Sequence, residues 1–244
     1  MDKAFTLLLC SLLFLSCNSS ESASDDDTNK STPKPKKVDI SILHLDKFSP
    51  ESTFDNCLEL STYQLLATAR QHLEGFIKTE LLQNNESLNT GYQRFVEEWT
   101  GQSYSNMNTK KLLDDNFAKA LYAHPNFKNI WIPLSETGDT VYTQEVAYDE
   151  NGNGVIVKYI ENYLTLNKKS DYYKCLKNEK NGFIQNYLVS KEYGEIEPQD
   201  FAMETLQSLD DEQFDDIKIQ QIIITELYLR IIALRQKQQD KTKE

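Results

Sequence analysis

The segment from 214 to 239 limits the fold more than any other, because it predicts one long helix rich in branched apolar side chains. These residues are Ile217, Ile219, Ile222, Ile223, Ile224, Leu227, Leu229, Ile231, Ile232 and Leu234. They cover more of the helix circumference than the single apolar stripe of a surface helix. Ser208 and the acids behind it are typical of a helix start, where side-chain oxygens cap free N–H groups. We therefore expect this helix to lie at the centre of its domain or to turn one face toward a partner.

Helical periodicity recurs in much of the remaining chain. Apolar residues spaced three and four apart predict helices over 61–83, 92–99, 109–123, 171–178, 183–193 and 198–209. Ser61 and Gln64 have the spacing of a capping box at the start of the first of these helices. Residues 38–42 alternate apolar and polar side chains and predict a short strand.

The middle of the chain has a different character. Residues 129–134 look extended, and 140–148 and 155–160 are rich in β-branched and aromatic side chains. An Asn-Gly pair between the last two runs favours a tight hairpin. We expect a small antiparallel hairpin or meander from about 129 to 161. The alternative is a helix from Val155 through Leu166.

The predicted fold class is thus α+β and predominantly α-helical. It comprises a helical domain with a small inserted antiparallel β-hairpin or meander and a long C-terminal helix. About two hundred residues, 38–244, are enough for one globular domain with its own core.

The N-terminus predicts export. A short apolar run, residues 4–15, follows Lys3 and ends at Ser16 and Cys17. This run is too short to span a membrane and is typical of a cleaved signal. Ser16-Cys17 after Phe14-Leu15 resembles the relaxed box of lipoproteins from Bacteroidota. The resemblance implies a signal peptide over 1–16 and a diacylglycerol and palmitate anchor on Cys17, so that the membrane is a partner through this lipid. The alternative is an ordinary secreted protein whose Cys17 carries no lipid.

Residues 17–37 predict a lipid anchor followed by a disordered tether, because no side chain larger than Ala23 is apolar there. The run Asp25-Asp26-Asp27 resembles surface-export signals of Bacteroidota lipoproteins. We expect an outer-membrane lipoprotein of the cell envelope, facing either the cell surface or the periplasm. Asp139-Thr140-Val141 resembles the O-glycosylation site of secreted proteins from the same group, which makes Thr140 a glycosylation candidate.

The net charge limits the kinds of partner that the chain can bind, and the cysteines raise the question of a disulfide. The formal net charge is -12, and the charges of the tether cancel, so the folded part carries the excess of acid. Nucleic acid is disfavoured as a partner because it requires a basic face. Cys57 and Cys175 remain after the signal and the anchor. In an oxidising compartment they either form a disulfide or stay as two buried thiols.

Two constellations are candidate binding sites. Asp149, Asn151 and Asn153 match the first half of a calcium loop, although a plain hairpin turn explains them as well. We predict no other cofactor. Residues 192–216 hold ten acids and no Lys or Arg, and form either a solvated surface or a site for a basic protein partner. The partner-binding candidates are Glu192, Glu195, Glu197, Asp200 and Glu204.

No catalytic residue is assigned. The histidines, His44, His72 and His124, lack zinc spacing, and no nucleophile elbow or phosphate loop is present. The favoured hypothesis is a non-enzymatic envelope lipoprotein with a binding or inhibitory, immunity-like role. One alternative is a hydrolase of peptidoglycan or glycans with dispersed carboxylates. Another is a structural or assembly lipoprotein that uses its C-terminal helix as an interface.

Overall fold

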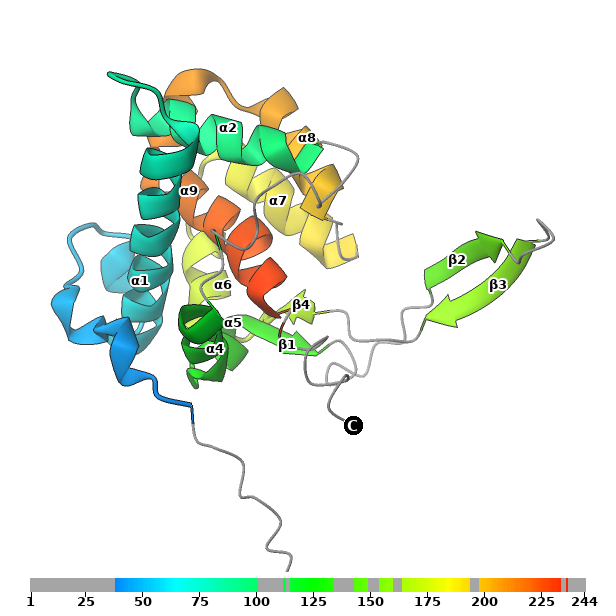
Figure 1. The fold of residues 1–244 in the computed structure, drawn as a ribbon, viewed down its shortest axis with the longest axis horizontal. Coiled ribbons are helices and arrows are strands. Elements are labelled where there is room, and N and C mark those ends of the chain that lie inside the picture. Colours follow the sequence, from blue (N-terminus) through cyan, green and yellow to red (C-terminus); the bar gives the residue numbers. More distant parts are fainter. Residues whose placement is uncertain are drawn as a thin grey trace, which may run out of the picture. The chain divides into compact units, whose positions relative to one another are not determined.

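The fold is predominantly helical with two small antiparallel sheets, which confirms the predicted fold class (Figure 1). The structure, a computed structural model, describes residues 38–100, 112, 115–133, 143–148, 154–159, 164–193, 198–233 and 236. Its α-helices are α1 (Leu60–Phe76), α2 (Leu88–Thr100), α4 (Asp115–Ala123), α5 (Phe127–Ile130), α6 (Asp171–Lys177), α7 (Gly182–Tyr193), α8 (Pro198–Ser208) and α9 (Ile217–Ile223). None of the helices in these ranges combines the length and apolar character needed to cross a membrane.

Shorter helical turns join these elements. Two are π-helical, η4 (Ile77–Leu81) directly after α1 and η7 (Ile224–Leu229) directly after α9. The 3-10 turns are η1 (Ser41–Leu43), η2 (Leu45–Lys47), η3 (Asp55–Cys57) and η6 (Asp211–Asp215). π-Helical turns inside α-helices often occur at functional positions.

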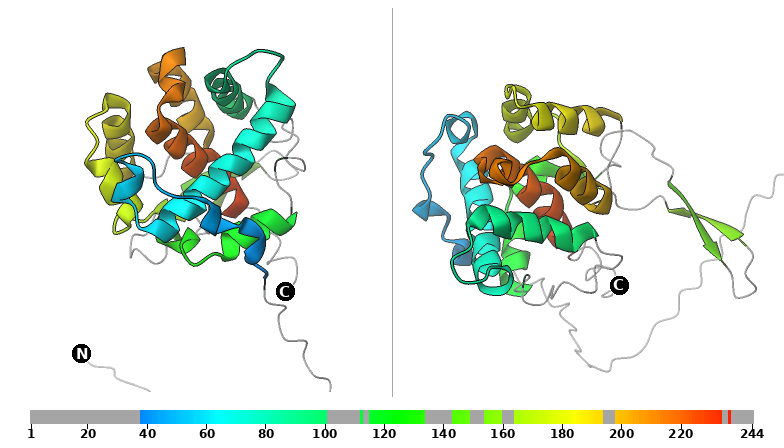
Figure 2. Two further views of the ribbon diagram at one scale, coloured as in Figure 1. Left: turned by 90° about the vertical axis from the view of Figure 1, so that its left-hand side faces the viewer. Right: turned by 90° about the horizontal axis from the view of Figure 1, so that it is seen from above.

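The last helix lies at the centre of the domain, as its wide apolar surface predicts. α9 and η7 run between α1 on one side and α7 on the other (Figure 1, Figure 2). Every residue from 219 to 230 is buried. η7 packs against α1 and α8, and the Tyr228 hydroxyl lies 2.6 Å from Nδ1 of His72 on α1. The core of the domain is therefore assembled around this helix.

The start of the last helix differs from the expectation of a single helix capped by Ser208. Ser208 is instead the final residue of α8. Asp210 forms a capping box with Gln213 at the start of η6. Asp216 then accepts from the Lys218 N–H and caps α9. The acidic run thus provides two successive caps, because each aspartate can satisfy free backbone N–H groups at a helix start.

The capping box predicted at Ser61 and Gln64 is wrong, because a distant residue caps α1. Asp171, at the start of α6, accepts from the Glu59 N–H at 2.7 Å and from the Thr62 hydroxyl at 3.3 Å. Ser61 accepts from the amide of Asn126 at 2.6 Å. A carboxylate supplied through the tertiary fold therefore replaces the local cap.

The strand predicted over 38–42 is also wrong, because this segment turns into η1. The Asp39 carboxylate accepts from both the backbone N–H and the hydroxyl of Ser41, at 2.9 and 2.7 Å. Such local bonds from an aspartate favour a turn over an extended chain.

The β residues form two separate pairs rather than one meander. β2 (Thr143–Tyr148) pairs antiparallel with β3 (Gly154–Tyr159), with Tyr148 opposite Gly154. This confirms the predicted hairpin and contradicts a helix beginning at Val155. β1 (Trp131–Pro133) pairs instead with β4 (Leu164–Leu166), which the sequence did not predict. β4 is buried along its whole length, so its pairing with β1 is favoured by burial of apolar surface.

Candidate binding surface

Helices α7 and α8 form a shallow groove. Its lining residues are Phe183, Asn186 and Tyr187 from α7 and Phe201, Glu204, Thr205 and Ser208 from α8. The spacing within each helix is three and four residues, which places each set on one helical face. The groove therefore forms where two helix faces with large and small side chains meet.

The groove has an aromatic floor and a polar rim. Tyr187 and Phe201 are buried and meet edge to face, with ring centroids 6.0 Å apart and planes at 71°. Asn186, Glu204 and Ser208 are exposed around them. The empty space of the depression, about 260 Å³, includes open solvent, so the groove is shallow and is not an enclosed cavity.

Most polar side chains of the rim are available for hydrogen bonds with a ligand. The Thr205 hydroxyl donates to the Phe201 carbonyl oxygen at 2.7 Å and is thereby occupied within its own helix. Within the described residues, by contrast, no hydrogen bond involves the side chains of Asn186, Glu204 or Ser208. These three groups face solvent and can accept hydrogen bonds from a ligand.

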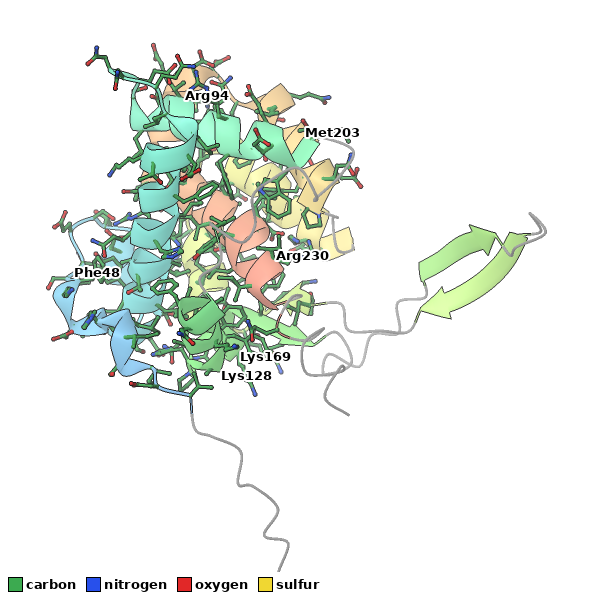
Figure 3. The ribbon with its side chains drawn as sticks, in the orientation of Figure 1. Phe48, Arg94, Lys128, Lys169, Met203 and Arg230 are labelled. Carbon is green, nitrogen blue, oxygen red and sulfur yellow. A yellow bond between two sulfur atoms is a disulfide. The ribbon has the colours of Figure 1, made fainter. Side chains whose placement is uncertain are left out.

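A buried charged cluster lies behind the groove. The Glu226 carboxylate on η7 accepts from the Tyr187 hydroxyl at 2.6 Å and from the Lys191 ammonium at 3.0 Å. The Arg230 guanidinium approaches the same carboxylate at 3.5 Å. Lys191 and Arg230 both lie near the Trp131 ring, at 5.4 and 5.6 Å from its centroid. All three charged side chains are at least 97% buried, and Figure 3 shows Arg230 among the helices.

This charged cluster holds part of the groove floor in place. Burying a charge is costly unless opposite charges and hydrogen bonds compensate it, so the partners of Glu226 have little freedom to move. Tyr187 belongs to both features, since its ring lines the groove and its hydroxyl donates to Glu226. The groove therefore rests on side chains that are already held in place, as a binding site requires.

Of the predicted partner-binding acids, Glu204 lines the groove and Asp200 lies one helical turn before it on α8. Glu192 at the end of α7, and Asp200 and Glu204 on α8, are all exposed. Glu192 lies beside Tyr173, where burial, followed by the negative charge of this glutamate, raises the pKa of the phenol. Glu195 and Glu197 lie outside the described residues. Asp211, Glu212 and Asp215 on η6 add three further exposed acids.

Acids elsewhere in the fold are paired with cations. Arg94 donates to both oxygens of Glu86, and these hydrogen bonds lower the pKa of that carboxyl. Lys218 donates to Glu179 at 2.7 Å, which raises the pKa of the ammonium. Among the described residues, no ion pair involves the exposed acids Glu192, Asp200, Glu204, Asp211, Glu212 or Asp215. These six acids therefore present negative charge that no described lysine or arginine pairs with.

The structure joins Cys57 and Cys175, the pair that the sequence left open, by a disulfide with Cα atoms 5.8 Å apart. The lipidation candidate Cys17 and the glycosylation candidate Thr140 lie outside the described residues. The calcium candidates Asp149, Asn151 and Asn153 lie outside them too, and across the described ranges no cluster of three or more His, Cys, Asp or Glu side chains is arranged to hold a metal ion.

The charged cluster around Glu226 was not predicted, although the sequence contains a signal for it. Glu226 is the only charged residue in the apolar run 219–229 of the last helix, and an acid in such a position requires a buried cation. Lys191 carries no comparable signal because it lies among polar residues. His72 is half-buried and stacks on Phe117, with ring centroids 4.1 Å apart.

Comparisons of the chain with protein-family models, with curated proteins and with solved structures found no match.

Proposed function

We propose that the chain is an exported, lipid-anchored protein of the cell envelope that binds a positively charged protein partner through its acidic surface. We define the acidic surface as the exposed acids Glu192, Asp200, Glu204, Asp211, Glu212 and Asp215. One observation carries the proposal: these acids lie in solvent without ion pairs to described cations, whereas Glu86, Glu179 and Glu226 are paired. A concentrated field of one sign steers an oppositely charged partner and speeds its association.

The disulfide supports export of the protein. Disulfides form and persist in the periplasm and outside the cell, and are rare in reducing compartments. Cys57 and Cys175 therefore agree with the N-terminal signal, although they lie far from it in the sequence. In its sharpest form the proposal describes an immunity-like protein, which neutralises a basic toxin that reaches the envelope.

Binding is favoured over hydrolysis by the composition of the groove. Hydrolysis of a glycosidic bond generally uses two carboxyl groups about 5–10 Å apart. Among the described residues, Glu204 is the one carboxylate that lines the α7–α8 groove. The assembly alternative needs an exposed apolar face on the last helix, but residues 219–230 are buried within the domain.

Photo-crosslinking in the cells that natively express the chain tests the proposal. A crosslinking amino acid at Met203, which is 40% exposed on α8, should trap a discrete adduct (Figure 3). The same amino acid at Ile42, which is 38% exposed on η1, serves as the control and should not trap this adduct. Asp200→Lys with Glu204→Lys should abolish the adduct, because the partner would meet like charge. An adduct that persists in this double variant, or that forms equally at Ile42, would refute the proposal.

The anchor needs a separate test. Cys17→Ser should move the chain from the membrane fraction to the soluble fraction, because two or three acyl chains hold a protein on a membrane far better than one or none. Protease treatment of intact cells then distinguishes surface display from a periplasmic face. Unchanged membrane association of Cys17→Ser would contradict the lipid anchor but would leave the acidic surface unaffected.

A further inference from the structure

We infer that the α7–α8 groove receives one lysine or arginine side chain of the partner. This inference rests on the proposed function and deepens it, because it converts a diffuse attraction between charges into a specific contact. The groove is the feature of the acidic surface where apolar and negatively charged groups lie together. The chemistry of its floor and rim identifies the occupant.

The size of the groove favours a single side chain. Pockets for free small molecules usually enclose roughly 300–1,000 Å³ and cover most of the ligand. The empty space of the groove, about 260 Å³, includes open solvent, so the volume that the groove encloses is far smaller than that of such a pocket. A side chain held by a larger partner is suited to such a site, because contacts outside the groove supply the rest of the affinity.

The floor suits the stem of a long basic side chain. Lysine and arginine carry three or four methylene groups that pack on apolar surfaces while the charged head stays polar. Phe183, Tyr187 and Phe201 provide that surface. An aromatic ring also attracts a cation placed over its face.

The rim suits the charged head. Ammonium and guanidinium groups donate hydrogen bonds and accept none. The Glu204 carboxylate, the Asn186 amide oxygen and the Ser208 hydroxyl are exposed acceptors around the groove. The described residues that line the groove include no lysine or arginine that would repel a cation. The nearest cation along α7, Lys191, is directed at Glu226 and not at the groove.

The negative charges near the groove disfavour an anionic ligand. Glu204 lines the groove, and Asp200 lies on α8 one helical turn before it. A carboxylate or phosphate in the groove would meet these two negative charges. The groove therefore discriminates between ligands by sign, through attraction of the cation and repulsion of the anion.

Binding of defined peptides to the full chain carrying Cys17→Ser tests the inference. The probe is a fluorescent peptide with four arginines separated by glycines. Its binding is measured by fluorescence anisotropy at low salt. A lysine version compares the two cations, and a citrulline version removes the charge while keeping the shape. Asn186→Trp fills the groove without changing the net charge. Gln207→Trp, an exposed amide on α8 outside the groove, is the matched control.

We expect Asn186→Trp and Glu204→Gln each to weaken binding of the arginine peptide about tenfold, or about 1.4 kcal/mol. Gln207→Trp should leave binding unchanged, and the citrulline peptide should bind at least tenfold more weakly. All variants should keep the thermal unfolding midpoint of the parent, since the substituted residues are exposed.

The outcomes separate the groove from the acidic surface. Equal binding by Asn186→Trp and Gln207→Trp would overturn the groove. If Asp211→Lys with Glu212→Lys still weakened binding, the proposed function would survive that result. Equal binding of the citrulline peptide, or no binding of the arginine peptide at low salt, would overturn both proposals.

Discussion

The cluster around Glu226 provides the sharpest test of what holds this fold together. Glu226→Gln keeps the shape of the side chain but removes the negative charge that faces Lys191 and Arg230. Both cations then stay buried and lose this counter-ion, and the Tyr187 hydroxyl loses a charged acceptor. Removing one partner from a buried ion pair costs about 3–5 kcal/mol, because the remaining charge is still desolvated.

This loss is large compared with the stability of an ordinary domain. The free energy of unfolding of a folded domain is about 5–15 kcal/mol. For a domain of about 150–250 residues, each kcal/mol changes Tm by roughly 2–4 °C. Glu226→Gln should therefore lower Tm by about 6–20 °C. Thermal unfolding followed by circular dichroism measures this shift, and urea unfolding gives the change in free energy directly.

A surface ion pair provides the control. Glu179→Gln removes the pair with Lys218, which is 30% exposed, and should cost about 0.2–1 kcal/mol. Lys191→Met and Glu226→Gln should be strongly non-additive in a double-mutant cycle, because each variant removes the same ion pair. If Glu226→Gln lowers Tm no more than Glu179→Gln, the buried cluster does not stabilise the fold as we have reasoned.

Three further predictions concern other parts of the domain. A Cβ added at Gly91 would collide with Ile77, so Gly91→Ala should cost about 1–3 kcal/mol in urea unfolding. Gly75→Ala meets no atom within 4 Å and should stabilise by about 0.5–1 kcal/mol; a loss at both positions would contradict this pair. Burial lowers the pKa of His124, so the unfolded chain binds this proton more tightly than the folded chain. Stability should then fall as the pH drops below about 6.5, the unfolded pKa, and His124→Gln should reduce that fall in urea midpoints measured at several pH values. Reducing the Cys57–Cys175 bridge, which spans 118 residues, should lower the free energy of unfolding by about 2–5 kcal/mol; an unchanged urea midpoint in reductant would refute this estimate.

The sequence predicts those parts of the fold that depend on local spacing. Apolar residues three and four apart lead to α1, α2, α6, α7 and α8 close to their observed bounds, because an amphipathic helix repeats every 3.6 residues. The central place of α9 follows from the width of its apolar surface. The β2–β3 hairpin follows from two β-rich runs on either side of an Asn-Gly pair.

Contacts between segments far apart in the sequence could not be predicted from local spacing. Asp171 caps α1 from across the domain, and Leu164–Leu166 pairs with Trp131–Pro133 after a long excursion of the chain. The groove was missed for a related reason. Its residues on α7 and α8 have the spacing of ordinary core positions, and only the packing of the two helices shows which of them reach solvent. The acidic surface, by contrast, could be predicted, because its acids belong to a sequence run without lysine or arginine.

The disulfide has a mechanical consequence for an anchored chain. If the proposed anchor and tether are present, a pull on them would enter the domain ahead of residue 38 and could unfold only the segment before Cys57, roughly 65 Å of extended chain. At Cys57 the tension passes through the sulfur bridge to Cys175 on α6, and therefore bypasses α1. Asp171, four residues before Cys175, holds the first turn of α1 beside the same point. If the chain is anchored as proposed, such a force would stop at α6, and the helices α7 and α8 that form the proposed binding groove would stay folded.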